Sequence, residues 1–428
     1  MDFNIFLLRF GLDPANFTNA VLEPIKTEFG FIYEVEQRTD TRECPACKSH
    51  NAFIHNYFFI QINCSENNHQ QDILRIRKVR FKCNDCQATF TPKLVGIDRY
   101  SHISDMQKHL ILSDFLGKLT FTQIAQKYHL SKMRIIQLFD ENIKIVPRLA
   151  MPRALCIDEI KFSEDLDQNY VCVLTNFDTG EIVDILRNRQ MAYLREYFAS
   201  ISPREREVTK VVISDMYEAY DTVSRQYFPK AIHVIDLFHV ITQLTNAVNR
   251  LRTRAMNNVA AKGSNIYNFM KSHWKLFLCR HSKIPDKFYT CRRTGEIVHY
   301  DDMVFKCVKI TETLWSGYNI LQELFKYGSY ANFEDATNFM IRISKRLLDT
   351  RDEILASVGQ TYHKWRFEIA NGLARSQGHR PYSNSIAEVV NNHLKTIIKS
   401  AYGYHNFERF RKRALLISSN NKPNRKEP

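Results

Sequence analysis

Residues 154–160 read ALCIDEI, a short apolar run that ends in two adjacent acidic residues. Such a run predicts a buried strand over residues 154–158, with Asp158 at its carboxyl end. Open α/β sheets place their ligands at that end of their strands. Because successive strand residues point to opposite faces, only one of Asp158 and Glu159 can face a site there, and the flanking Leu155 and Ile157 favour Asp158.

The residues that follow predict a mixed sheet with helices packed on it. A hairpin is expected from strands over residues 170–177 and 181–189, with residues 178–180 as its turn. Helix and strand patterns then alternate, with helices at 191–201, 217–228 and 238–252 and strands at 208–214 and 232–235. The order β-β-β-α-β-α-β-α resembles that of ribonuclease H-like nucleases.

Two further acids complete a candidate metal site. Asp215 follows the strand expected at 208–214, and Glu388 lies in the helical stretch SNSIAEVVNNHLK, residues 383–395. Three converging carboxylates could hold two divalent ions, one activating a nucleophilic oxygen and one stabilising the leaving oxygen. Oxygen ligands of this kind suit Mg²⁺ or Mn²⁺. Structural roles compete with this interpretation, because an Asp after a strand is often a helix cap, a helical Glu often faces solvent, and Glu368 competes with Glu388.

Two Cys-x-x-Cys pairs, Cys44 with Cys47 and Cys83 with Cys86, predict a structural zinc site. Four thiolates close a tetrahedral Zn²⁺ site with no open position, so this site would fold a small module rather than catalyse. Strands over residues 57–62 and 73–81 would bring the pairs together. Two alternatives stay open: one pair is only buried thiols, or Cys64, His50 or His69 replaces a ligand. The same strands carry basic residues among aromatic ones, which predicts contact with a DNA backbone through Arg75, Arg77, Lys78, Arg80 and Lys82.

Residues 105–116 have a helical pattern, and residues 120–139 read as helix, turn, helix. Ala125 allows the two helices to approach closely, Leu130 fills the turn and Ser131 caps the second helix. With Ile135, Ile136 and Leu138 in the core, the side chains left to reach a DNA groove are Lys132, Arg134 and Gln137. Many helical hairpins share this pattern without binding DNA. Pro147 and Pro152 mark a boundary before the first strand of the mixed sheet.

Composition favours a multidomain protein with a polyanionic partner. The chain has 428 residues, 44% of them hydrophobic, which predicts two to four domains. Sixty Lys and Arg against 46 Asp and Glu give a net charge of +14, which favours nucleic acid over a basic protein with no such partner. Neither a signal peptide nor an uncharged apolar stretch long enough for a bilayer is present, so we expect a cytosolic protein without a membrane partner. Ten cysteines in a reducing compartment favour metal ligands over disulfides.

The long stretch between Asp215 and Glu388 predicts a helical insertion. Most of residues 249–378 reads as helices, including 310–326, 332–348 and 361–372. A second group of potential ligands, Cys279, His281, Cys291 and Cys307, has irregular spacing. We therefore favour core thiols over a second metal site there.

On these motifs the chain resembles DDE transposases of bacterial insertion sequences, closest to the ISL-three family. The resemblance rests on Ile157-Asp158-Glu159, on residues 214–217 (SDMY), 234–240 (VIDLFHV) and 391–395 (NNHLK), and on Ser383-Asn384-Ser385 before Glu388. Ser385 stands where the family usually has Gly. The segment from Asp236 to His239 resembles an Asp-x-x-His signature, which implies that both residues lie beside the active site. His239 could also serve only in helix packing.

The resemblance implies a multidomain α+β architecture. Its expected parts are an N-terminal segment (1–40), a zinc ribbon (41–95), a helix-turn-helix (100–147), a ribonuclease H-like mixed-sheet core (152–248 and 379–415), an all-helical insertion domain (249–378) and a basic tail (416–428). It also implies that Asp158, Asp215 and Glu388 hold Mg²⁺ or Mn²⁺. The enzyme would bind the ends of its insertion sequence, cut there to expose a 3′-hydroxyl, and join that hydroxyl to target DNA.

Lys395, Lys399 and Arg375 would contact phosphates in this scheme. The implied partners are double-stranded DNA, as element ends and as target, and a second copy of the chain in a homodimer. The implied location is the bacterial nucleoid in the cytoplasm. Two other functions remain open: a non-catalytic DNA-binding regulator that keeps the zinc ribbon and helix-turn-helix, and a nuclease or recombinase with a tyrosine or serine nucleophile.

Overall fold

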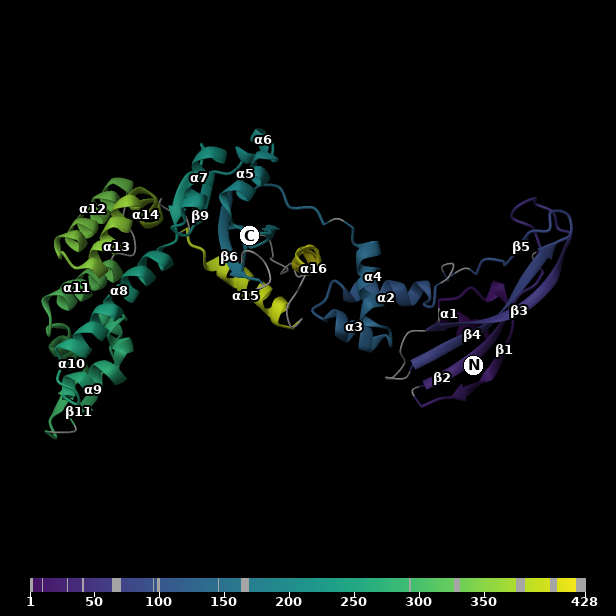
Figure 1. Cartoon of the computed structure of the whole chain (residues 1–428), viewed down its shortest axis with the longest axis horizontal. Coiled ribbons are helices and arrows are strands. Elements are labelled where there is room, and N and C mark those ends of the chain that lie inside the picture. The colour runs from purple at the N-terminus through teal and green to yellow at the C-terminus, as the bar shows by residue number, and fades with distance from the viewer. Residues whose placement is uncertain are drawn as a thin grey trace. The chain divides into compact units, whose positions relative to one another are not determined.

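The computed structural model of this chain describes residues 3–9, 11–28, 30–40, 42–63, 71–94, 96–97, 101–144, 146–162, 169–291, 294–326, 332–374, 382–400 and 406–420. The chain divides into two compact units. One comprises Met1–Pro147 together with Ile397–Pro428, and the other comprises Arg148–Thr396. Figure 1 shows the elements of both units, which are described separately below.

The first unit contains a five-stranded sheet that carries both cysteine pairs. Its strands are β1 (Phe17–Lys26), β2 (Gly30–Gln37), β3 (Ala52–Asn63), β4 (Gln71–Cys83) and β5 (Thr89–Phe90), in the order β1-β2-β4-β3 with β5 against β4. The two expected ribbon strands lie within β3 and β4. Strands β1 and β2 were not predicted, and β2 joins the sheet by pairing in parallel with β4. A core that includes Leu7, Phe17 and Leu74 packs on this sheet, with Leu7 contributed by α1 (Phe3–Arg9).

Helices from both ends of the chain complete the first unit. The predicted helices are α2 (Asp105–Asp114), α3 (Phe121–Lys127) and α4 (Lys132–Asn142). The C-terminal helix α16 (Phe407–Asn420) packs on them. Arg413 of α16 is 1% exposed, lies over the ring of Phe121 at 4.8 Å, and donates to the carbonyl of Leu119. Sequence reasoning assigned residues up to 415 to the catalytic core, whereas residues from Ile397 onward group with the first unit.

The second unit is built on a mixed sheet in the order β10-β9-β6-β7-β8. Its strands are β6 (Ala154–Lys161), β7 (Tyr170–Asn176), β8 (Ile182–Leu186), β9 (Val211–Ser214) and β10 (Ile232–Ile235). Strands β6, β7 and β8 are antiparallel, whereas β6, β9 and β10 run parallel. The expected order of strands and helices is therefore present, with a short extra helix α6 (Pro203–Arg206) before β9.

Helices cover both faces of this sheet. On one face, α5 (Met191–Ala199) and α7 (Glu218–Tyr227) pack Leu194, Phe198 and Val223 against strand residues such as Leu155. On the other face, Ala387 of α15 (Ser385–Ser400) packs with Cys156. Figure 1 shows α5 and α7 on one side of β6 and β9 and α15 on the other.

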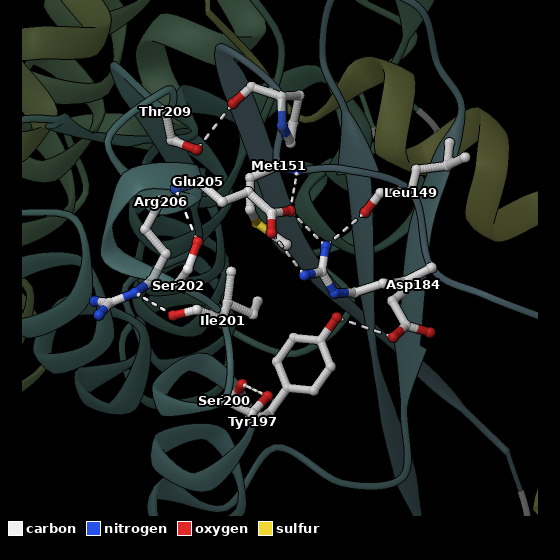
Figure 2. A network of polar contacts seen from close by, with 12 residues as sticks. Leu149, Met151, Asp184, Tyr197, Ser200, Ile201, Ser202, Glu205, Arg206 and Thr209 are labelled. Carbon is white, nitrogen blue, oxygen red and sulfur yellow. Dashed lines mark hydrogen bonds and ion pairs between the residues drawn. The ribbon is translucent and has the colours of Figure 1, made fainter.

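A polar network fixes the chain where it enters β6 (Figure 2). The guanidinium of Arg148 donates two hydrogen bonds, of 2.6 and 2.9 Å, to the carboxylate of Glu205 on α6. The same carboxylate accepts from the backbone N–H of Met151 at 3.0 Å, and the Thr209 hydroxyl donates to the carbonyl of Pro152 at 2.8 Å. The start of β6, and with it the register of Asp158, is therefore held by a bidentate ion pair.

The rest of the second unit is mainly helical, as expected for residues 249–378. It consists of α8 (Leu237–Asn258), α9 (Asn265–Ser272), α10 (Tyr300–Val308), α11 (Glu312–Lys326), α12 (Phe333–Asp349), α13 (Glu353–Lys364), α14 (Arg366–Leu373) and a hairpin of β11 (Phe288–Thr290) and β12 (Ile297–His299). The helix expected at 361–372 is two helices that meet at Trp365. Helix α14 lies against β10, where Gly372 approaches the carbonyl of Ile235 so closely that a Cβ would be 2.8 Å from it.

No helix in the described part of the chain combines the length and apolarity needed to cross a membrane.

Candidate functional site

Three aspartates lie in one row across the three parallel strands. Asp215 and Asp236 directly follow β9 and β10, whereas Asp158, which was expected at the end of its strand, lies within β6, because that strand continues to Lys161. In the β6–β9 ladder Cys156 pairs with Ile213, so Asp158 and Asp215 each lie two residues further along. In the β9–β10 ladder Ser214 pairs with Ile235, so Asp215 and Asp236 each lie one residue further along. Two of these acids were predicted as catalytic from their strands, and the third from its motif. The strand register places all three of these residues at the same level of the sheet.

Asp215 is the acid that is least satisfied by the protein. One of its carboxylate oxygens, Oδ1, is buried and has no hydrogen-bond partner among the described residues. Burial, reinforced by the negative charges of Glu159 and Asp158, raises the pKa of Asp215 to about 6. A nearby cation would remove this cost, because it replaces the missing partner and favours the ionised carboxylate.

Asp158 is held by two hydrogen bonds. Its Oδ1 accepts from the backbone N–H of Glu159 at 2.8 Å, and its Oδ2 accepts from the side-chain amide of Asn391 at 2.8 Å. Burial raises its pKa, while the Glu159 N–H and the charge of His239 oppose that rise. Asn391 is 4% exposed and lies on α15. The sequence motif at residues 391–395 contains Asn391, but no role was predicted for this residue.

Asp236 and His239 lie at the start of α8. Asp236 is the helix N-cap, is 2% exposed and accepts from the backbone N–H of Phe238 at 3.3 Å. Burial raises its pKa, and the backbone N–H groups of Phe238 and Asn384 and the charge of His239 act in the opposite direction. His239 thus lies close enough to all three aspartates to favour their ionised forms.

Glu388 lies in the first turn of α15 and is exposed. It shares one helical stripe of α15 with Asn384 and Asn391, four residues before it and three residues after it. These two neighbours contact Asp236 and Asp158. However, the four cysteines are the one group of three or more metal-ligand residues in the described chain whose donor atoms all lie within 4.8 Å of one another. The carboxylate oxygens of the acids are therefore farther apart than the ligand atoms of a closed metal site.

The competing acids both have structural partners. The carboxylate of Glu159 accepts from the guanidinium of Arg189, with 2.6 Å to Oε1, and from the hydroxyl of Tyr220 at 3.4 Å. Glu368 is 8% exposed and pairs with Arg225 at 2.8 Å. Neither partner of Glu159 was recognised from the sequence, because both lie far from it along the chain.

A cleft of about 680 Å³ opens beside Asp215 and His239. Its other walls come from α8 and from α13, so the cleft extends from the acidic row into the helical part of the same unit. The predicted phosphate contacts Lys395 and Lys399 are exposed on α15, whereas Arg375 lies outside the described residues.

The four predicted zinc ligands converge in the first unit. The sulfur atoms of Cys44 and Cys86 are 3.5 Å apart, those of Cys47 and Cys83 are 3.6 Å apart, and all four lie within 4.8 Å of one another. A tetrahedral site with Zn–S bonds of 2.3 Å separates its sulfurs by about 3.8 Å. The backbone N–H of Cys47 is the largest factor that lowers the pKa of Cys44 to about 7. Against the lowering effect of the Ser49 backbone N–H, the Cys86 thiol and burial raise the pKa of Cys47 to about 12, so the metal-free cluster favours the thiolate at Cys44.

Both knuckles also share one backbone shape. Lys48 and Gln87, each directly after a cysteine pair, adopt positive φ angles of 61° and 62°. Each donates its backbone N–H to the carbonyl of the first cysteine of its pair. The described residues therefore fit a Zn²⁺ ion. His50 is not part of this cluster, and Cys64 and His69 lie outside the described residues.

The second cysteine group does not form a metal site among the described residues. Cys291 and Cys307 are buried in the core of the helical part, and His281 pairs with Asp301 at 2.7 Å. The preference for core thiols agrees with this arrangement.

The predicted DNA-contacting residues have mixed surroundings. On α4, Lys132 is exposed, while Gln137 donates to Glu141 at 2.8 Å and Arg134 lies 3.8 Å from the same carboxylate. On the sheet, Arg75 pairs with Glu34 at 2.8 Å and Arg77 with Glu36 at 3.1 Å. These pairs partly neutralise Arg75 and Arg77, because each of the two guanidinium groups already has a carboxylate partner.

The remaining basic residues of the sheet lie near aromatic rings and other groups. Arg80 lies over the ring of Phe58 at 5.2 Å, and Lys78 also has a partner. Lys82 pairs across the ladder with Phe53, whose side chain is 44% exposed. Basic residues of β4 thus lie beside aromatic residues of β3, and the sequence indicated this combination.

Comparison with known proteins identifies the family. The model of a transposase family, the ISL3 group of DDE transposases, matches residues 155–414. The chain belongs to this family. It is 22% identical over 345 residues to the transposase of insertion sequence element IS1001 from Bordetella parapertussis, a match that covers 79% of each chain.

Two shorter similarities involve about a third of this chain or less. The chain is 26% identical over 127 residues to the transposase of insertion sequence element IS1557 from Mycobacterium tuberculosis, covering 30% of this chain and 28% of the relative. It is 28% identical over 122 residues to a Lactococcus lactis protein described as an ATP-dependent protease, covering 28% and 35%.

Proposed function

We propose that the chain is an insertion-sequence transposase that cuts and joins DNA with divalent metal ions held by Asp158, Asp215 and Glu388. The observation that carries the proposal is the row of acids formed by Asp158 within β6 and by Asp215 and Asp236 directly after β9 and β10, in a sheet whose strand order resembles ribonuclease H-like nucleases. The unpartnered Oδ1 of Asp215 supports a cation at this position. Mg²⁺ and Mn²⁺ suit its oxygen ligands.

Each residue of the site has a separate task in this proposal. Asp158 holds metal from within β6 and Asp215 from the end of β9, and Asn391 keeps the Asp158 carboxylate oriented through its 2.8 Å hydrogen bond. Glu388 on α15 completes the set of metal ligands. For this, α15 must move slightly toward the aspartates, or the Glu388 side chain must change its rotamer, when metal and DNA bind. His239 favours the ionised carboxylates, and Asp236 caps α8 and so fixes the position of His239. When bound, the metal ions would supply an activated nucleophilic oxygen and stabilise the leaving oxygen.

The first unit would bind DNA in this proposal. The four cysteines hold Zn²⁺ and stabilise the sheet module, while Lys132, Arg134 and Gln137 reach the element ends from α4. The net charge of +14 supports a polyanionic partner. Two ends must meet for transposition, so we propose a homodimer that acts on nucleoid DNA in the cytoplasm.

The test is a cleavage assay on duplex DNA that carries the inverted repeats flanking the gene. Wild type should cut at the repeat in Mg²⁺, while Asp158→Asn and Glu388→Gln should lose roughly a hundredfold or more in rate. Matched controls are Asp302→Asn and Glu334→Gln, which change exposed acids on α10 and α12. Equal rates for all variants would contradict the assignment. Binding without cleavage by wild type would favour the non-catalytic regulator, and a covalent protein–DNA adduct would favour a tyrosine or serine nucleophile.

A further inference from the structure

A polar groove leads away from the acidic row along two helices. We call it the α8–α13 groove and define it by Thr242, Gln243 and Asn246 of α8 and Ser357, Gln360 and Thr361 of α13. It forms the wall of the 680 Å³ cleft beside Asp215 and His239. A second cavity of about 380 Å³ shares Gln243, Asn246 and Ser357 with it and extends to Arg250 and Glu353.

The groove follows one face of each helix. On α8 the lining positions run from His239 to Arg250, at spacings of three and four residues. The neighbouring face of α8, with Leu244, Val248 and Leu251, is buried in the core of the helical part. At 1.5 Å per residue, the eleven steps from His239 to Arg250 span about 16 Å, the length of roughly five stacked nucleotides at 3.4 Å each. The groove is therefore long enough for a short DNA strand.

The charge of the groove favours contact with bases over contact with phosphates. Both duplex and single-stranded DNA are held at their phosphates mainly by Lys and Arg side chains. Here the charged lining residues are Asp215, Glu218 and Glu353 against Lys364 and Arg250, and Lys364 already pairs with Glu218. The six residues that define the groove are uncharged. Such amides and hydroxyls match the donors and acceptors on the edges of unpaired bases.

Gln243 gives a second, independent indication of a ligand. Its side-chain oxygen, Oε1, is buried and has no hydrogen-bond partner among the described residues. A buried acceptor without a donor costs free energy, so a ligand that donates to it gains affinity. The residue itself, Gln243, lines both cavities.

From this we infer that the α8–α13 groove binds unpaired DNA, one to a few nucleotides that adjoin the phosphate at the acidic row, through the edges of their bases. The inference rests on the proposed function for the identity of the nucleic acid. The helical part of the second unit would then hold the unpaired nucleotides beside the site of reaction. No covalent step is involved.

The probe is a twelve-residue oligothymidylate single strand with 5-bromodeoxyuridine at one position, bound to the full chain in Ca²⁺ without Mg²⁺. Two measurements are made: the dissociation constant, and the peptides that crosslink under ultraviolet light. The test variant is Gln243→Leu with Asn246→Leu, and the matched control is Asn257→Leu, an exposed amide of α8 outside the groove. Thermal unfolding followed by tryptophan fluorescence verifies that each variant is folded.

Wild type should crosslink within residues 239–250 and 353–365. Loss of one net hydrogen bond costs about fivefold in affinity, so the double variant should bind about 25-fold more weakly and lose these crosslinks. The control should match wild type. Crosslinks confined to residues 1–147, or equal binding by the double variant, would overturn the inference. Because Ca²⁺ binding requires no cleavage, a chain that crosslinks in the groove but never cuts DNA would contradict only the proposed function.

Discussion

Asp215→Asn should stabilise the metal-free protein above pH 6. The pKa of Asp215 is raised from an ordinary 3.8 to about 6 by burial and by the charges of Glu159 and Asp158. The two values differ by about 2, and each unit corresponds to 1.36 kcal/mol, so ionising this carboxylate in the folded protein costs about 3 kcal/mol. Between pH 4 and 6 the folded state binds the extra proton. The free energy of unfolding therefore falls as pH rises through this window and stays low above it.

An asparagine cannot ionise, so the variant avoids this cost. We expect its unfolding free energy to exceed that of wild type by up to about 3 kcal/mol at pH 8, and the difference to vanish near pH 4. Tryptophan fluorescence is the suitable probe, because Trp274, Trp315 and Trp365, the three tryptophans of the chain, all lie in the unit Arg148–Thr396. Unfolding in urea is compared at the two pH values in chelator.

The control is Asp302→Asn, an exposed acid of the same unit, which should change the unfolding free energy by less than about 0.5 kcal/mol at either pH. Added Mg²⁺ should stabilise wild type but not Asp215→Asn, since only the carboxylate attracts the ion. A variant that is less stable than wild type at pH 8, or a difference that does not depend on pH, would refute the reasoning.

Three further predictions concern other contacts. Asn391→Ala removes a hydrogen bond to the charged Asp158, a contact worth about 1.5–3 kcal/mol. Initial cleavage rates should therefore fall roughly ten- to hundredfold. The control Asn392→Ala, at the exposed neighbouring position, should retain the wild-type rate. Cys83→Ser should abolish bound zinc as measured by elemental analysis, yet leave the tryptophan unfolding transition in place; zinc content equal to wild type would contradict the four-cysteine site. Arg409→Ala breaks a bidentate pair with Asp140, with contacts of 2.7–3.1 Å, so trypsin should release α16 several-fold faster; an unchanged rate would show that the pair does not hold this helix.

Local patterns were sufficient to predict most of the mixed sheet. The apolar runs before Asp158, Asp215 and Asp236 each form a strand, because a buried strand needs an uninterrupted apolar segment. The break at Trp365 was missed because the apolar period continues through it. Strand β2 was missed because it owes its place to parallel pairing with β4, about forty residues away in sequence.

The site was predictable only in part for a similar reason. Local sequence identified the strands that carry the acids, although it ended β6 three residues too early, and the common row of acids follows from strand register. Asn391 contacts Asp158 across 233 residues of sequence, and α16 joins the first unit although the sequence places it after the core. Such contacts arise from tertiary packing, which periodicity does not encode. The spacing of three residues between Glu388 and Asn391 was the one local signal that linked the amide to the site.

If Asp158 holds a catalytic metal ion, a change of its ligand atom should change the metal preference of the reaction. Asp158→Cys replaces a hard oxygen ligand by a softer thiolate, which Mg²⁺ binds poorly and Mn²⁺ accepts better. Initial cleavage rates of the element-end duplex are measured in each metal for wild type and variant. We predict that the variant is inactive in Mg²⁺ and regains part of its activity in Mn²⁺, while Asp302→Cys behaves as wild type in both. Equal activity of Asp158→Cys and wild type in Mg²⁺ would contradict a metal-binding role of Asp158.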